Sequence, residues 1–282
     1  MLLNFSKSIQ FLPYIHLARL HRPIGIWLLL WPCFIGLAIC RGSFFDYLLF
    51  FLGAIITRSA GCVINDIIDV DFDKKVIRTK SRPLASNQIT KKQAYIEAFL
   101  LLTLSGCLWI FLNKSAKFLS LIALCMLAIY PFMKRFTYLP QVFLGFTFNI
   151  GLPIAIMHTS NLTFSWRLIN LFFSLILWTI FYDSIYAFAD LKDDFKIGIK
   201  STAIIMRKSP KLWLSLINIL LHMLLFTSNG FFAAFVGACF LQTLLIQWNP
   251  HDLDNCIKTF TYCHFWGLME WLWLEFVRII TP

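Results

Sequence analysis

Residues 44–85 read FFDYLLFFLGAIITRSAGCVINDIIDVDFDKKVIRTKSRPLA, an apolar segment that becomes acidic and then basic. Its first part is long enough to cross a bilayer as an α-helix, which takes about 20 predominantly apolar residues. Five acidic or amide side chains then follow within the nine positions 65–73. An Asp at the centre of an inserting helix costs roughly 2.5–3.5 kcal/mol. We therefore treat this cluster at the membrane edge as a candidate functional site.

Similar apolar runs recur along the whole chain of 282 residues, of which 59% are hydrophobic and 14% charged. This apolar fraction exceeds the range of soluble globular domains, and the runs lack the alternation of a membrane β-barrel. The sequence predicts an all-α, polytopic membrane protein. We expect nine spans, at 23–40, 44–66, 93–112, 116–132, 139–157, 167–188, 212–227, 230–248 and 260–280. No linker rich in Gly, Ser or Pro interrupts them, so residues 1–282 are expected to form one membrane domain.

The basic residues fall mostly on one side of these spans. With the N-terminus inside, nineteen Lys and Arg lie on the inner side and five on the outer side, while Arg58 lies within a span. This is the positive-inside pattern, so the net charge of +11 reflects topology and does not indicate a nucleic-acid partner. From the N-terminal residues we expect neither a cleavable signal peptide nor a transit peptide. These features favour a bacterial cell inner membrane, with the long polar loops 67–92 and 189–211 in the cytoplasm.

The first acidic cluster forms one stripe on a predicted helix. Asn65, Asp69 and Asp73 are spaced i, i+4 and i+8, and Arg58 lies on the same face two turns earlier. Asp71 points to the opposite side of the helix. Stacked carboxylates repel one another unless a cation lies among them, and hard oxygen donors suit Mg²⁺ together with substrate phosphates.

The second acidic cluster lies in FYDSIYAFADLKDDFKIGIKSTA, residues 181–203. On a helical wheel Asp183, Asp190 and Asp194 fall within about 40° of one another, with Tyr186 nearby. Basic residues follow this cluster, as they follow the first. One such cluster could be ordinary solvated loop charge. Two clusters with matching spacing on the same side instead predict a pair of sites for a Mg²⁺–diphosphate, with Arg and Lys balancing the remaining charge.

The Cys and His residues suggest no other site. The eight Cys are scattered, none forms a CxxC pair, and the six His are dispersed. We expect no disulfide and no zinc site.

These motifs resemble those of a known family. NDIIDVDFD is similar to the first acidic motif of UbiA-type intramembrane prenyltransferases, and DLKDD is similar to their second motif. RLHRPIGIWLLLWP, RTKSRPLAS, YPFMKRFTYLPQ, YDSIYAFAD and KIGIKSTAI resemble the 4-hydroxybenzoate polyprenyltransferase branch. The sequence departs from the family pattern at His21, where Asp is usual, and at Lys192, where an acidic residue is frequent.

The resemblance implies about nine transmembrane helices around a central cavity and dependence on Mg²⁺. It implies transfer of a polyprenyl group from polyprenyl diphosphate to the 3-position of 4-hydroxybenzoate, in ubiquinone biosynthesis. The partners would then be these two substrates and the lipid bilayer, without an obligate protein partner.

The candidate residues take four roles. For the metal they are Asn65, Asp69, Asp73, Asp190 and Asp194. For catalysis they are Asp183, Asp190 and Asp194. For the diphosphate they are Arg58, Arg78, Arg82, Lys134, Arg135 and Lys200. For the aromatic acceptor they are Arg22 and Tyr186.

Other functions remain compatible with the residues alone. One is a related prenyltransferase whose acceptor is haem, homogentisate or naphthoate. Another is an anion transporter, although transport pathways place charges nearer the bilayer midplane. A membrane scaffold without catalysis leaves both acidic clusters unexplained.

Overall fold

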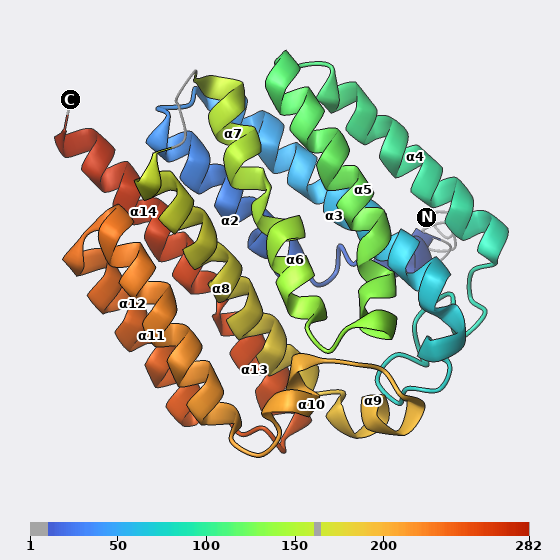
Figure 1. The fold of residues 1–282 in the computed structure, drawn as a ribbon. Coiled ribbons are helices and arrows are strands. Elements are labelled where there is room, and N and C mark those ends of the chain that lie inside the picture. Colours follow the sequence, from blue (N-terminus) through green and yellow to red (C-terminus); the bar gives the residue numbers. More distant parts are fainter. Residues whose placement is uncertain (1–10, 161–164, 282) are drawn as a thin grey trace, which may run out of the picture. The chain divides into compact units, whose positions relative to one another are not determined.

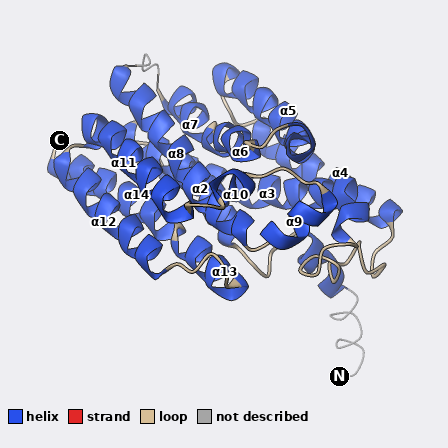
Figure 2. Cartoon of the chain, turned by 60° about the horizontal axis from the view of Figure 1, so that its bottom comes forward, coloured by secondary structure: helices blue, strands red, loops and turns tan. Residues whose placement is uncertain are grey.

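The computed structural model describes residues 11–160 and 165–281. Within these ranges the ordered elements are helices joined by loops, and no strand occurs (Figure 2). This confirms the predicted all-α class. The chain groups into two compact units, one formed by Met1–Trp27 with Phe51–Leu112 and the other by Leu28–Phe50 with Asn113–Pro282. Two helices, α2 (Ile24–Ile39) and α3 (Phe44–Asp73), pass from one unit to the other. The single domain over 1–282 stays a prediction.

The first unit contains most of α3, the loop that follows it, and α4 (Lys91–Trp109) (Figure 1). Thr90 begins α4 with a capping box, in which its hydroxyl accepts from the Gln93 backbone N–H while Gln93 bonds back to Thr90. A small apolar core holds the unit together. Its buried members come from the N-terminal segment, α3, the loop and α4: Leu17, Val63, Val70, Leu84, Ile89, Ala94 and Ala98. This core fixes the loop against the acidic end of α3.

Helix α3 is longer than the predicted span 44–66. Its 30 residues correspond to about 45 Å, whereas the hydrocarbon core of a bilayer is about 30 Å thick. The helix has no internal Pro to end it, so it continues without a break through the acidic cluster to Asp73. The cluster therefore lies on regular helix, as the wheel analysis assumed.

The second unit is a bundle arranged around the central helix α8. Its complete helices are α5 (Lys114–Phe136), α6 (Pro140–Asn149), α7 (Gly151–Thr159), α8 (Trp166–Phe188), α9 (Leu191–Ile197), α10 (Thr202–Met206), α11 (Pro210–Asn229), α12 (Phe231–Gln247), α13 (Leu253–Tyr262) and α14 (His264–Ile280). Helix α8 packs against α6, α10, α11 and α13, and α12 packs against α11 and α14. Several residues of α8 are accordingly fully buried, among them Leu175, Trp178 and Phe181.

Two predicted spans are interrupted. The span 139–157 divides at Ile150 into α6 and α7, because Pro153 has no N–H to bond the carbonyl one turn earlier. The last span, 260–280, divides at Cys263 into α13 and α14. There the Cys263 carbonyl accepts hydrogen bonds of 3.2 Å from the buried Trp178 indole and from Trp266 N–H, so this backbone group at the break is paired.

The described residues include five helical segments long and apolar enough to cross a membrane. These are α3, α5, the α6–α7 pair, α8 and α11, and the apolar helices α2 and α12 are shorter. Every predicted span falls on a helix or on a pair of helices. The polytopic class is therefore confirmed, while the number nine is not.

Candidate functional site

The acidic end of α3 separates its side chains by burial. Asp66, Asp69 and Asp73 are 2%, 1% and 7% exposed, Asn65 is half-buried and Asp71 is exposed. The exposure of Asp71 confirms the prediction that it lies apart from the stripe. Buried carboxylates must be paired or bound to a cation, so each of these three needs an ion-pair partner or a metal ion.

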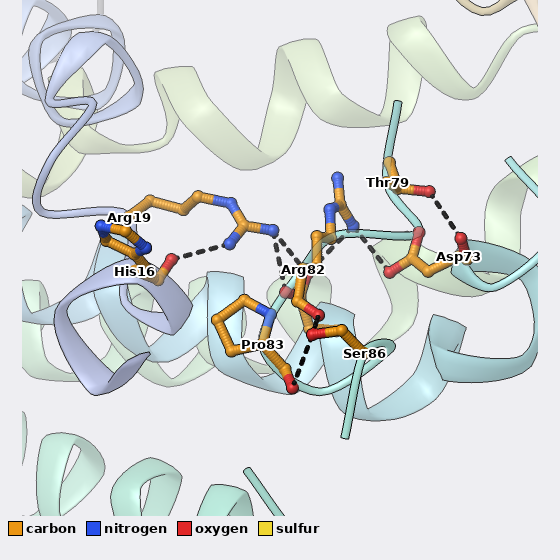
Figure 3. Close-up of polar contacts among 8 residues, drawn as sticks. His16, Arg19, Asp73, Thr79, Arg82, Pro83 and Ser86 are labelled. Carbon is orange, nitrogen blue, oxygen red and sulfur yellow. Dashed lines mark hydrogen bonds and ion pairs between the residues drawn. The ribbon is translucent and has the colours of Figure 1, made fainter. Parts of the chain in front are cut away.

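Two arginines from distant parts of the chain meet this cluster (Figure 3). The Arg19 guanidinium donates to both carboxylate oxygens of Asp66, at 3.0 and 2.8 Å, across 47 positions of sequence. The Arg82 guanidinium donates to Asp66 at 3.0 Å and to Asp73 at 2.8 Å. Asp66 is thus held by two cations, and Arg82 bridges two carboxylates one above the other on α3. Charge-assisted pairs of this kind fix orientation as well as providing attraction.

An unusual backbone conformation at Arg19 directs its side chain toward Asp66. Arg19 has a φ of +59°, a left-handed conformation that costs a non-glycine residue about 1–3 kcal/mol. It ends the N-terminal helix in a Schellman-type turn, with Leu20 N–H bonded to the Ile15 carbonyl at 3.1 Å. The guanidinium also donates to the His16 carbonyl at 2.8 Å. The strained turn is held in part by the Asp66 ion pair.

The loop after α3 fixes Arg82 in a comparable way. The Thr79 hydroxyl donates to the Asp73 carbonyl at 3.0 Å, closing the end of α3 (Figure 3). Arg82 N–H bonds the Thr79 carbonyl at 3.0 Å, and the Arg82 carbonyl accepts from Ser86 N–H at 2.9 Å and from the Ser86 hydroxyl at 2.8 Å. Pro83 follows directly and is buried. The segment RTKSRPLAS therefore forms a compact turn that presents Arg82 to the carboxylates.

The electrostatics of this helix end favour cations. A helix C-terminus carries a partial negative charge, and α3 ends in acidic residues with no basic residue in its last turn. The donor set of one amide and two carboxylates on one face fits Mg²⁺ in its chemistry. In the described part of the chain, no group of three or more His, Cys, Asp and Glu side chains is arranged to hold a metal ion. The cation that contacts Asp73 is the Arg82 guanidinium.

Arg58 lies two turns before the acidic cluster and packs closely against α2. A Cβ added to Gly25 would lie 2.9 Å from an Arg58 terminal nitrogen and 3.0 Å from its guanidinium carbon. Real Cβ atoms essentially never approach within 3.0 Å. A side chain at position 25 would therefore force the Arg58 guanidinium to move from its place against α2.

The second motif is not one regular helix, so the wheel used for it is wrong beyond residue 188. Helix α8 ends at Phe188, and Asp190 has φ −106° and ψ 0° before α9 begins at Leu191. The N–H groups of Asp193 and Asp194 bond the Asp190 carbonyl at 3.0 and 2.9 Å. Asp183 thus lies on α8, Asp190 at the break and Asp194 on α9. All three are half-buried, and Lys192 is exposed.

The segment KIGIKSTA is attached to neighbouring helices of the second unit. Lys200 N–H bonds the Lys134 carbonyl at 3.0 Å, and its ammonium group donates to the Phe136 carbonyl at 3.2 Å. Thr202 N–H bonds the Gln141 side chain at 3.2 Å, and the Thr202 and Ser184 hydroxyls lie 2.7 Å apart. The structure therefore brings Lys200 and Lys134 together, at the end of α5.

Tyr186 is packed inside the second unit. Its ring lies 4.7 Å from the Phe260 ring of α13, centroid to centroid, and one turn earlier the buried Tyr182 contacts the same Phe260 ring. The Tyr186 ring is thus packed against α13 within the second unit. The remaining predicted basic residues differ in exposure. Arg78 is half-buried, and Arg22 and Arg135 are exposed.

Two residues of the network, Arg19 and Asp66, were not among the predicted site residues. The spacing contained a signal for Asp66, because it precedes Asp73 by seven residues and so lies within about 20° of it on a helix. No signal in the spacing indicated that Arg19 would reach Asp66.

His21, where the sequence departs from the family pattern, lies beside this network. Its ring centroid is 4.3 Å from that of His16. Partial burial lowers the pKa of His21 below its ordinary value, and the neighbouring His16, Arg22 and Arg19 lower it further. Its neutral form is therefore favoured among these positive charges.

Comparison with known proteins gives consistent results. A model described as the UbiA prenyltransferase family matches residues 29–269. The chain is 40% identical over 274 residues to a 4-hydroxybenzoate octaprenyltransferase of Pseudomonas aeruginosa, with 92% of this chain and 91% of that protein covered. Among solved structures, a UbiA homologue from Aeropyrum pernix K1 is similar with a TM-score of 0.73 and 20% identity, covering 90% of this chain and 96% of that one. A UbiA homologue from Archaeoglobus fulgidus bound to DMAPP and Mg²⁺ has a TM-score of 0.70 and 16% identity, covering 95% and 99%.

Proposed function

Because the chain belongs to the UbiA prenyltransferase family, we propose that it is a 4-hydroxybenzoate polyprenyltransferase of ubiquinone biosynthesis. The reaction transfers a polyprenyl group from polyprenyl diphosphate to the 3-position of 4-hydroxybenzoate. The observation that carries the proposal is the 40% identity, over nine-tenths of both chains, to a protein named for this activity. The same similarity disfavours an anion transporter and a membrane scaffold. The experiment below tests the identity of the aromatic acceptor.

We assign one Mg²⁺ to Asn65, Asp69 and Asp73 and a second to Asp190 and Asp194. The donor chemistry supports this, because oxygen ligands at a membrane edge suit Mg²⁺, and the Archaeoglobus fulgidus homologue was solved with DMAPP and Mg²⁺. Bound Mg²⁺ would stabilise the negative charge that develops on the departing diphosphate.

The basic residues complete the diphosphate site in this proposal. They are Arg58, Arg78, Arg82, Lys134, Arg135 and Lys200. Arg82 is the best supported, since two carboxylates and a compact turn hold its guanidinium in a defined position. A preoriented cation stabilises leaving-group charge without reorganisation during the reaction.

The chain supplies the remaining chemistry through its side chains and its apolar surroundings. Breaking the allylic carbon–oxygen bond leaves a cation, which the electron-rich ring carbon ortho to the phenol attacks. The ring then loses the proton from that carbon, and Asp183, Asp190 or Asp194 is assigned to accept it. Tyr186, held against Phe260, and Arg22 are assigned to the aromatic acceptor, with Arg22 facing its carboxylate. The apolar membrane helices accommodate the isoprenoid tail. We place the protein in a bacterial inner membrane, with these residues on the cytoplasmic side.

The decisive experiment incubates membranes containing the protein with labelled 4-hydroxybenzoate, a polyprenyl diphosphate and Mg²⁺, and measures lipid-soluble label. We expect product with 4-hydroxybenzoate, none after EDTA, and recovery when Mg²⁺ is restored. Homogentisate, dihydroxynaphthoate and haem serve as competing acceptors. Prenylation of one of these in place of 4-hydroxybenzoate would disprove the acceptor assignment, and undiminished activity in EDTA would disprove the metal assignment.

A matched pair of variants tests the first motif. Asp69→Asn removes a buried carboxylate of the predicted site, and Asp71→Asn removes an exposed one two positions away. We expect Asp69→Asn to lose at least about a hundredfold in rate, equivalent to about 2.7 kcal/mol, and Asp71→Asn to stay within a few-fold of the parent. If both variants lose the same factor in rate, burial on α3 does not distinguish the metal ligands from the other carboxylates.

A further inference from the structure

A pocket in the second unit is lined by none of the residues assigned to prenyl transfer, although Phe188 and Leu191 in its wall lie on either side of Asp190 in the sequence. It has a volume of about 340 Å³. Its walls come from the end of α8, the start of α9, the α10–α11 turn, the first turn of α11 and the α12–α13 loop. The polar lining residues are Arg207, Lys208, Ser209, Lys211 and His251. None of the predicted metal or diphosphate residues lines it.

The lining is strongly positive. Arg207, Lys208 and Lys211 are basic, and the described lining contains no carboxylate. Two acidic residues adjoin lining residues in the sequence, Asp190 before Leu191 and Asp252 after His251. Asp252 accepts hydrogen bonds from the first N–H groups of α13, at 3.0 and 3.1 Å. Three like charges around one pocket repel one another unless an anion lies among them.

The first turn of α11 adds to this positive field. A helix N-terminus carries partial positive charge and N–H groups without intrahelical partners. Ser209 is the N-cap residue of this 20-residue helix, but its side chain makes no capping hydrogen bond. Its hydroxyl is thus not used by the helix and lies in the wall of the pocket.

Two of the cations are anchored by the protein itself. The Lys211 ammonium group donates to the Ile246 carbonyl at 2.9 Å, and the Arg207 guanidinium lies 5.6 Å from the Phe195 ring centroid. These contacts hold positive charge at the pocket without neutralising it. All three cations are exposed, and Lys208 is the third that an anion can contact.

The pocket lies where a membrane lipid can reach it. Helix α11 is one of the helices long and apolar enough to span a bilayer, and the pocket surrounds its first turn. Leu212 and Trp213 in that turn are 61% and 47% exposed, as expected for side chains at a membrane interface. A phospholipid whose headgroup phosphate lies in this pocket would keep its acyl chains in the adjoining bilayer.

We propose that this pocket binds a phosphate group, namely the headgroup phosphate of an anionic phospholipid. Basic pockets beside transmembrane helices on the inner side are suited to such headgroups. The lipid is a structural ligand of α11 and the α12–α13 loop, and it takes no part in prenyl transfer.

The test measures binding of phosphatidylglycerol and phosphatidylcholine to the purified full chain in detergent by native mass spectrometry. The variant Arg207→Gln/Lys208→Gln removes two charges. We expect it to weaken phosphatidylglycerol binding about thirtyfold, since each basic residue near a membrane surface contributes roughly a fivefold factor. Phosphatidylcholine should bind weakly to both proteins.

Two matched variants control for charge and folding. Lys91→Gln/Lys92→Gln removes an exposed basic pair at the start of α4 and should leave binding within about twofold. Arg207→Lys/Lys208→Arg keeps both charges and should retain most of the affinity. Unchanged phosphatidylglycerol binding in the double Gln variant, or an equal loss in the α4 control, overturns the site. Displacement of phosphatidylglycerol by millimolar inorganic phosphate would overturn the lipid assignment and identify a site for free phosphate.

Discussion

Replacing Asp66 by Asn tests the arginine network most directly. Asn has nearly the same size and keeps one oxygen acceptor, but it removes the charge that Arg19 and Arg82 share. The Asp66 side chain is 3% exposed, whereas those of Arg19 and Arg82 are 21% and 19% exposed. The change therefore leaves two partly buried guanidinium groups facing a neutral amide.

The expected loss of stability follows from these exposures. Removing one partner of a fully buried ion pair costs about 3–5 kcal/mol. Because both arginines retain some contact with water, we expect about 2–3 kcal/mol. Part of this loss comes from the Arg19 turn, whose left-handed backbone would no longer be held by an ion pair to α3. The midpoint of thermal unfolding in detergent should fall by roughly 5 °C or more.

The variant should also alter the metal requirement. With Asp66 neutral, Arg82 keeps Asp73 as its charged partner, and the local negative potential is weaker. Both effects disfavour Mg²⁺ at Asp73. We expect the Mg²⁺ concentration for half-maximal prenyl transfer to rise about three- to tenfold, while excess Mg²⁺ restores much of the rate.

The assays are Mg²⁺ titration of prenyl transfer and thermal unfolding, with Asp71→Asn as the control at an exposed carboxylate of the same helix. Double-mutant cycles with Arg19→Gln and Arg82→Gln separate the two ion pairs. If Asp66→Asn matches the parent in stability and in Mg²⁺ dependence, the network does not position Arg82. Additive effects in both cycles would lead to the same conclusion.

Three other outcomes are expected. Gly25→Ala should displace Arg58 and lower the rate of prenyl transfer at least tenfold. In the control Gly53→Ala the added Cβ meets nothing within 4 Å, so the rate should not change. Equal rates in the two variants would show that Gly25 is not needed to position Arg58. The pKa of His21 is lowered in the folded state, so the unfolded chain binds the extra proton first and stability falls as the pH drops below about 6.5. In His21→Gln the midpoint of thermal unfolding should depend less on pH between pH 7.5 and 5.5. If the midpoint falls with pH as steeply as in the parent, His21 is not the cause of the pH dependence. A Cys at exposed Ser81, in a chain without other Cys, should react with an impermeant thiol reagent only from the cytoplasmic side, and labelling from outside would reverse the topology.

Much of the fold could be predicted from local pattern. The length of each apolar run predicted a helix, because a membrane segment must satisfy its backbone hydrogen bonds internally. The spacing of α3 predicted which acids share a face, and the exposure of Asp71 agrees with it. That prediction succeeded because α3 is a regular helix through Asp73, so position along the chain determines direction.

The second motif shows where this reasoning fails. The wheel from Asp183 to Asp194 assumed one helix, whereas α8 ends at Phe188 and the chain turns at Asp190. No Pro or Gly stands between Asp183 and Asp194 to indicate the break. The segment that follows is bonded to α5, α6 and α8 through Lys200 and Thr202. Contacts with distant helices can override a local helical preference.

The sequence by itself determined that this chain is a bundle of membrane helices with two acidic motifs, and it identified most of the charged residues that surround them. The tertiary structure alone decided which of those charges meet. Arg19 and Asp66 are 47 positions apart, and their contact depends on a left-handed turn before α2 and on the burial of one face of α3. Spacing determines neighbours only within one regular helix, whereas a pairing between segments depends on how the backbone between them turns and packs.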